Sequence, residues 1–183
     1  MNKGFLANLI TFSRIAFIPF LIISELQEKY VQSLIIILLI SMSDIVDGMV
    51  AKQAESNCKG GDIFDIAADF MVVLSIFVLW YLKQMVSAYI IFLILFSFIT
   101  FGYISFLKKK IVKSKMGKYV GAVCFLGITV IIFTRLYFKE IFVISQNLVL
   151  IIVSIYLIIS IIENIRNIIK ENFLQEKKDV GKR

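Results

Sequence analysis

The sequence has no histidine, one proline, one tryptophan and two cysteines among its 183 residues. Without histidine, histidine general bases, haem ligation through histidine and most zinc sites are excluded together. Cys58 and Cys124 lie far apart in unlike settings, one polar and one apolar, so we expect two free thiols without a functional role. Pro19 lies within an apolar run, where a membrane helix tolerates proline as a kink.

Charged residues are also scarce, at 18%, whereas 60% of the residues are hydrophobic and the mean hydropathy is +0.91. A soluble domain of this length rarely has such a composition, so the sequence predicts an integral membrane protein. Six apolar segments are long enough to cross a bilayer as helices. We place these spans at Phe5–Ser24, Val31–Lys52, Asp62–Leu82, Ser87–Leu107, Met116–Phe138 and Ile141–Ile162.

The spans predict an all-α integral membrane protein, a bundle of six transmembrane helices. No linker or repeat divides the chain, so we expect one six-span domain over residues 1–162. Residues 163–183 form a charged tail that we expect to extend the last helix and then fray. The first span carries Arg14 and lacks a small-residue cleavage site after it, so we expect a retained helix rather than a cleaved signal peptide. Asp62 is expected to cap the third span.

Lysine and arginine are unevenly distributed over the segments between the spans. With both termini in the cytoplasm, fifteen of these residues lie on the cytoplasmic side and four on the other, while Arg14 lies within the first span. By the positive-inside rule, we expect both termini, the end of the second span and the start of the third to face the cytoplasm. We expect the membrane to be the plasma membrane. Because the positive charges border the spans, we expect contacts with anionic lipid head groups and no nucleic-acid partner.

Four carboxylates lie in or beside the second and third spans, two on each. Ionisable groups at membrane depth are costly, so four near one another need a compensating partner, most simply bound cations. On each helix, at 100° per residue, the carboxylates and nearby small residues fall within a sector of about 100° or less. One face carries Asp44, Asp47, Gly48 and Ala51, and the other carries Gly61, Asp65 and Asp69. We therefore expect the two faces to meet around metal ions and a bulky ligand.

These residues fit the pattern D-x2-D-G-x2-A-[R]-x8-G-x3-D-x3-D at every spacing, with Lys52 at the position given as arginine. The pattern resembles the signature of the CDP-alcohol phosphatidyltransferase family. The resemblance implies transfer of the substituted phosphate of a CDP-linked alcohol, usually CDP-diacylglycerol, to a small hydroxylated acceptor with release of CMP. It also implies a homodimer and a cofactor of Mg²⁺ or Mn²⁺, two hard ions that prefer oxygen ligands.

The same resemblance implies roles for the motif residues. Two metal ions would be held by Asp44, Asp47, Asp65 and Asp69. Asp65 and Asp69 are the catalytic candidates, and Asp69 is the family's proposed base for the acceptor hydroxyl. The nucleotide would approach where bulk is missing, at Gly48, Ala51 and Gly61, although small-residue helix packing is the alternative. Lys52 would serve the diphosphate as a point charge, without the bidentate fork of arginine.

The stretch NLITFSRIAFIP resembles the N-terminal stretch of the family's bacterial phosphatidylglycerophosphate synthases, which implies glycerol 3-phosphate as acceptor. Asn8, Thr11 and Arg14 are spaced to share a polar flank of the first span. In one interpretation Arg14 snorkels to the bilayer surface beside helix-capping neighbours. In the other, which we favour because Arg14 lies more than two turns inside the span, the flank faces the carboxylates or a substrate phosphate.

The basic segment KKKIVKSKMGK between the fourth and fifth spans also has two interpretations. Its lysines either follow the positive-inside rule and contact anionic lipid, or they gather a phosphorylated acceptor. Lys115 and Lys118 are the candidates for the second role. Ile66 and Phe70 stand where family members commonly have proline and lysine, which leaves the acceptor open.

Three alternatives accompany the leading hypothesis of a phosphatidylglycerophosphate-forming transferase. The same chemistry could serve another acceptor, such as serine or inositol phosphate. The aspartates could instead form the site of a divalent-cation transporter, but a cation pathway needs no glycine and alanine at fixed offsets, and the fourth and fifth spans contain no acidic residue. A non-catalytic relative that only binds a nucleotide lipid is the third alternative.

Overall fold

The structure, a computed structural model, describes residues 3–53, 61–107 and 119–180, with side chains within 12–43, 66–104 and 119–172. In these ranges the chain is helical, without a strand. The helices are α1 Lys3–Leu26, α2 Tyr30–Gln53, α3 Gly61–Leu82, α4 Ala88–Leu107, α5 Val120–Tyr137 and α6 Phe142–Val180.

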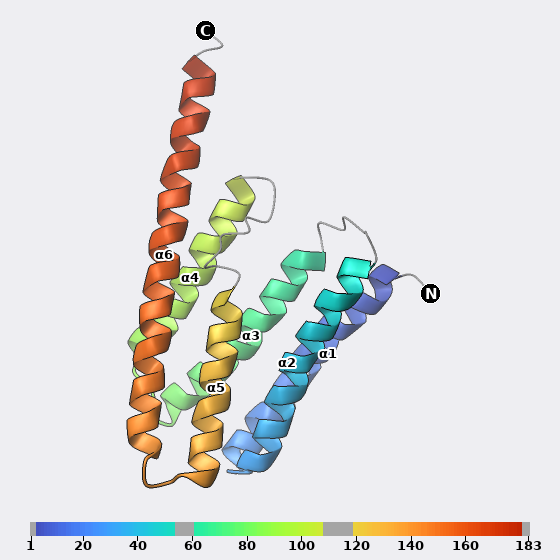
Figure 1. Cartoon of the computed structure of the whole chain (residues 1–183), viewed down its shortest axis with the longest axis vertical. Helices are drawn as coiled ribbons and strands as arrows, with labels where there is room; N and C mark the ends of the chain where they lie inside the picture. Colours follow the sequence, from blue (N-terminus) through green and yellow to red (C-terminus); the bar gives the residue numbers. More distant parts are fainter. Residues whose placement is uncertain (1–2, 54–60, 108–118, 181–183) are drawn as a thin grey trace.

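The helices run alternately up and down the bundle (Figure 1). In this view the start of α1, the end of α2 and the start of α3 point upwards, as do the ends of α4 and α6, and α6 extends farthest. The connections at residues 27–29, 83–87 and 138–141 lie at the opposite end. Within the bundle, α1 packs against α2 and α3, α5 packs against α2, α3 and α6, and α4 packs against α3 and α6. Successive helix ends therefore alternate between the two ends of the bundle, as the distribution of charges predicted.

Each of the six helices in the described ranges contributes apolar side chains to one continuous core. Burial of these side chains is the main favourable contribution to helix packing inside a compact bundle. Representative members, one from each helix in order, are Leu21, Ile37, Ile76, Ile90, Ile128 and Leu157. The helical pieces predicted from the sequence therefore form one body rather than separate units.

The predicted spans agree with the helices to within a few residues, and the last helix extends into the charged tail, as expected. Pro19 lies inside α1, as expected. Because α3 begins at Gly61, Asp62 lies in its first turn, and its prediction as a cap is wrong. The predicted start of the fifth span, Met116, lies outside the described residues. The sixth helix continues without a break from Ile162 to Val180, because neither glycine nor proline interrupts it before Gly181.

α1 and α3 end in the same backbone motif. The residues that follow their last turns, Glu28 and Gln84, have positive φ angles of 58° and 57°. In each case the next amide returns to the carbonyl five positions earlier, and the bonds are Lys29 N to Ser24 O and Met85 N to Trp80 O, both 2.9 Å. These are Schellman caps formed without glycine, and they turn the chain sharply into the next helix.

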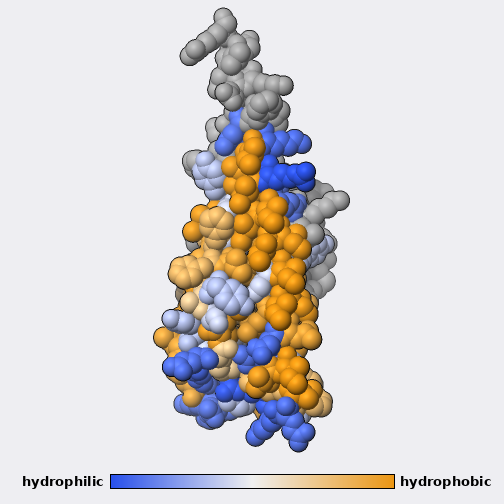
Figure 2. Space-filling model, turned by 90° about the vertical axis from the view of Figure 1, so that its left-hand side faces the viewer, coloured by the Kyte–Doolittle hydropathy of each residue, from blue (hydrophilic) through white to orange (hydrophobic). Residues whose placement is uncertain are grey.

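Much of the described surface is apolar. Two helical segments, Val120–Tyr137 and Phe142–Lys170, are long and apolar enough to cross a membrane, and α2, α3 and α4 contain shorter apolar stretches. Figure 2 shows a broad hydrophobic band over the visible face, with hydrophilic residues gathered at its lower end and again towards its upper end. Exposed side chains on α6 include Val143, Ile144, Leu148, Ile151, Ile155 and Ile158. A contiguous apolar surface of this kind indicates contact with lipid or another apolar partner.

Candidate active site

The two acidic motif segments lie at the same end of the bundle. Asp44 and Asp47 belong to the C-terminal half of α2, and Asp65 and Asp69 belong to the first turns of α3. Figure 1 shows the end of α2 and the start of α3 at a similar height, at the upper ends of these two helices and well below the end of α6. The predicted helical spacing of these residues is thus present in the backbone. The side chains of the first three aspartates lie outside those described, as do the surroundings of Gly48, Ala51, Lys52 and Gly61.

Asp69 is the motif aspartate whose side chain the structure describes, and it contacts Arg14. Nη1 of Arg14 lies 3.0 Å from Oδ1 of Asp69, forming both a hydrogen bond and an ion pair. The Arg14 side chain is wholly buried, whereas that of Asp69 is 20% exposed. Arg14 therefore does not snorkel to the surface, and the structure places it against a motif carboxylate, as one of the two interpretations expected.

Arg14 makes a second contact, to α2. Its Nε donates a hydrogen bond of 3.1 Å to Oγ of Ser43, the residue immediately before Asp44. The Ser43 hydroxyl in turn donates to the carbonyl of Ile40 at 2.7 Å. One guanidinium thus joins α1, α2 and α3 beside the acidic motif. The sequence analysis did not identify Ser43 as a site residue, although its position immediately before Asp44 could have indicated it.

Ile66 and Phe70 of α3 stand where family members commonly have proline and lysine. Ile66 and Phe70 are both half-buried. The Phe70 ring stacks on Phe98 of α4, with a centroid distance of 3.9 Å and an interplanar angle of 13°. Position 70 thus supports the contact between α3 and α4 directly beside Asp69, which is a packing role that a lysine would not fill.

The remaining substrate-binding candidates are placed less completely. Asn8 and Thr11 lie in α1, one and two turns before Arg14, and their side chains are outside those described. Lys115 and Lys118 lie outside the described residues altogether. Among the described side chains, no group of three or more could hold a metal ion. The all-carboxylate donor set still suits Mg²⁺ or Mn²⁺, and the described member, Asp69, is a partly exposed carboxylate held by Arg14.

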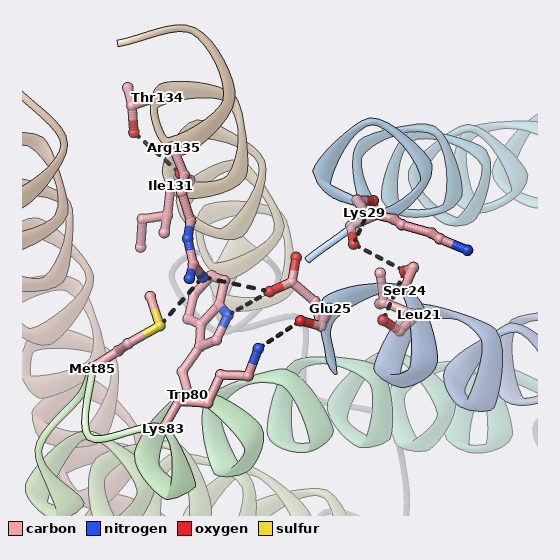
Figure 3. A network of polar contacts seen from close by, with 11 residues as sticks. Leu21, Ser24, Glu25, Lys29, Trp80, Lys83, Met85, Ile131, Thr134 and Arg135 are labelled. Carbon is pink, nitrogen blue, oxygen red and sulfur yellow. Dashed lines mark hydrogen bonds and ion pairs between the residues drawn. The ribbon is translucent and has the colours of Figure 1, made fainter. Parts of the chain in front are cut away.

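A second polar cluster lies near the ends of α1 and α3, at the opposite end of the bundle (Figure 1), and Figure 3 shows it from close by. Oε2 of Glu25 accepts a hydrogen bond of 3.2 Å from Nε1 of Trp80 and lies 4.0 Å from Nη1 of Arg135. Lys83 donates to the Glu25 carbonyl, and Arg135 also contacts the sulfur of Met85 at 3.4 Å. We call this group the Glu25 cluster. It fastens α1, α3 and α5 together and lies away from the acidic motif.

Comparison with known proteins settles the family. Residues 4–162 match the CDP-alcohol phosphatidyltransferase family. The chain belongs to that family. It is therefore a transferase, and the apolar helices agree with a membrane protein. A CDP-diacylglycerol–glycerol-3-phosphate 3-phosphatidyltransferase from Aquifex aeolicus (strain VF5) is 32% identical to it over 62 residues. That match spans 34% of this chain and 35% of the relative, so it covers about a third of each protein.

Proposed function

We propose that this family member transfers the phosphatidyl group of CDP-diacylglycerol to glycerol 3-phosphate, releases CMP and acts in phospholipid biosynthesis. The observation that carries the proposal is the complete acidic motif on the end of α2 and the start of α3, at one end of the bundle. The named Aquifex relative supports the acceptor, although the match covers only part of each chain.

In this reaction the acceptor hydroxyl oxygen forms a bond to the phosphorus of the phosphatidyl group. The bond from that phosphorus to the bridging oxygen of the diphosphate breaks, and CMP leaves with the electron pair. Asp44, Asp47, Asp65 and Asp69 would hold two Mg²⁺ or Mn²⁺ ions, which when bound would neutralise negative charge on the diphosphate. Asp69 would also receive the proton of the acceptor hydroxyl, as the family resemblance implies.

The other motif residues would bind the substrates. Gly48, Ala51 and Gly61 would leave room for the nucleotide between the two helices, and Lys52 would contact the diphosphate. Lys115 and Lys118 would attract the dianionic phosphate of the acceptor. Asn8 and Thr11, which precede Arg14 on α1, would line the same end of the bundle.

The proposed orientation in the membrane follows the positive-inside rule. We propose that all six helices span the plasma membrane and that the acidic end of the bundle and both termini face the cytoplasm. A helix of 20 residues is about 30 Å long, which matches the hydrocarbon core, and the shortest of the six has 18 residues. Basic residues at the acidic end would contact anionic lipid head groups, and a homodimer is the proposed assembly.

Membrane orientation can be tested with Cys58, which lies in the connection between α2 and α3. In a Cys124→Ala variant, a membrane-impermeant maleimide should label Cys58 in inside-out vesicles and leave it unlabelled in intact cells. Labelling in intact cells would reverse the proposed orientation. Lysing the cells before labelling controls for the reactivity of the thiol.

Activity should be measured as CMP release by the purified full-length protein with CDP-diacylglycerol and Mg²⁺ or Mn²⁺. Glycerol 3-phosphate, serine, inositol phosphate and inositol are offered in separate reactions. We expect release with glycerol 3-phosphate alone. Release with a different acceptor would keep the transfer chemistry and overturn the substrate assignment. No release with any of them, from protein that binds CDP-diacylglycerol, would contradict the proposed function.

A further inference from the structure

We propose that Arg14 is a positioning residue for the metal site. It fixes the carboxylate of Asp69 and ties the acidic segments of α2 and α3 together before metal ions and substrate bind. This inference rests on the function proposed above. It gives Arg14 a task other than direct contact with a substrate phosphate.

Burial is the first reason. The Arg14 side chain has no exposed surface, so its charge must be balanced by groups inside the protein. A counter-charge and a hydrogen-bond acceptor both lie at contact distance, at 3.0 Å on Asp69 and 3.1 Å on Ser43. A substrate phosphate could reach the guanidinium only by displacing these groups. Asp69 differs in this respect, because its side chain is 20% exposed and remains accessible from one side.

Orientation is the second reason. The Ser43 hydroxyl donates its hydrogen bond to the Ile40 carbonyl at 2.7 Å, so Ser43 can only accept a hydrogen bond from Arg14, through an oxygen lone pair. The hydroxyl is therefore fixed as an acceptor for Nε. The planar guanidinium, held on its Nε edge by α2, presents Nη1 to Asp69 in a set direction. Both ends of the contact are thus constrained.

Placement within the motif is the third reason. Ser43 immediately precedes the first motif aspartate, Asp44, and Asp69 is the last. Arg14 thus links the beginning and the end of a motif that is divided between two helices. Four carboxylates held close together repel one another, and one buried positive charge offsets part of that repulsion before cations arrive. Partners that orient metal-binding carboxylates typically contribute about 10–100-fold to metal affinity.

Metal binding without substrate tests the proposal directly. Mn²⁺ is titrated into the detergent-solubilised full-length protein, and free Mn²⁺ is followed by electron paramagnetic resonance. In Arg14→Gln we expect the Mn²⁺ dissociation constant to rise about tenfold or more. Arg14→Lys should recover part of that loss, because an ammonium cannot span both partners. Ser43→Ala retains the ion pair and should weaken Mn²⁺ binding about fivefold. If Arg14→Gln yields little folded protein, the Ser43→Ala variant tests the proposal in its place.

Arg135→Lys is the matched control, because it alters the ion pair between the half-buried Arg135 and the buried Glu25, at the opposite end of the bundle. It should lower the thermal midpoint and leave Mn²⁺ binding unchanged.

If the Arg14 and Ser43 variants lose only thermal stability, as the control does, Arg14 is merely structural and the proposal is wrong. A raised KM for either substrate with unchanged Mn²⁺ binding would instead show direct phosphate contact and would also overturn it. Failure of the proposed function is distinct, because it would appear as absent CMP release in unsubstituted protein that still binds Mn²⁺.

Discussion

The indole of Trp80 donates a hydrogen bond of 3.2 Å to the carboxylate of Glu25, and both side chains are about 1% exposed. This contact joins α3 to the end of α1, at the end of the bundle opposite the acidic motif. The guanidinium of Arg135 lies between the ring of Tyr30, at 4.4 Å, and the ring of Phe142, at 5.7 Å, so the Glu25 cluster also reaches α2 and α6.

Trp80→Phe should therefore destabilise the protein without altering catalysis. It removes a hydrogen bond to a buried charged group, worth about 1.5–3 kcal/mol. The measurement is the thermal midpoint in detergent, together with CMP release well below that midpoint. Tyr81→Phe, at the neighbouring exposed position, is the control and should change neither quantity. An unchanged midpoint in Trp80→Phe would show that the contact contributes nothing to stability.

Gly127→Ala should loosen the packing of α5 on α6. A Cβ at position 127 would lie 3.0 Å from Cγ2 of Val153 and 3.2 Å from Cγ1 of Val149, so the helices must separate or the valines must rotate. Overpacking of this kind typically costs about 1–3 kcal/mol. Gly121→Ala on the same helix is the control, since a Cβ there meets nothing within 4 Å, and it should be neutral or slightly stabilising. Equal thermal midpoints for the two variants would contradict the close approach.

Gln84→Gly should stabilise the protein. Residue 84 has a φ of 57°, a region that costs an L-amino acid about 1 kcal/mol and glycine almost nothing. Glu28→Gly tests the equivalent position after α1, where φ is 58°. Gln27→Gly, one residue earlier and without positive φ, should destabilise through the entropy of glycine. A fall in the thermal midpoint of both capping variants would refute the prediction.

Asp44→Asn, Asp47→Asn and Asp65→Asn should each reduce CMP release by about 100-fold or more, because each removes a charged oxygen ligand from the proposed metal site. The variants should remain folded in membranes, with thermal midpoints near that of the unsubstituted protein. Asp62→Asn is the control on α3, because Asp62 lies outside the motif pattern, and it should retain activity. Full activity in any of the three variants would contradict the two-metal interpretation.

Hydrophobic segments and motif spacing predicted the helical fold and the position of the acidic segments, because both depend on residues close together in sequence. Long-range partners were not predictable in the same way. The sequence favoured an Arg14 that faces the carboxylates or a substrate phosphate, but it did not identify the contacting residues, because Ser43 and Asp69 are 29 and 55 residues away. The first predicted span ended at Ser24, because the next residue, Glu25, is charged and a charged residue usually marks the end of a membrane segment. Glu25 is nevertheless buried, because Trp80 and Arg135 provide its donor and counter-charge from other helices.

The extension of the last helix into the charged tail was predicted, and α6 continues to Val180. Polar residues after Ile162 mark the end of the predicted span, because charge ends a membrane segment without ending a helix. At about 1.5 Å per residue, the 39 residues of α6 reach about 58 Å, well beyond a hydrocarbon core of about 30 Å.

The positions of Arg14 and Glu25 on α1 have a consequence for biogenesis. In the membrane proposed above, α1 is synthesised first and carries two ionisable residues whose partners do not yet exist. Asp69 arrives with α3 and Arg135 with α5. The first helix therefore cannot complete its final packing when it enters the bilayer, because these contacts form only after later helices emerge. The buried charges of α1 thus make its assembly depend on helices that follow it in the chain.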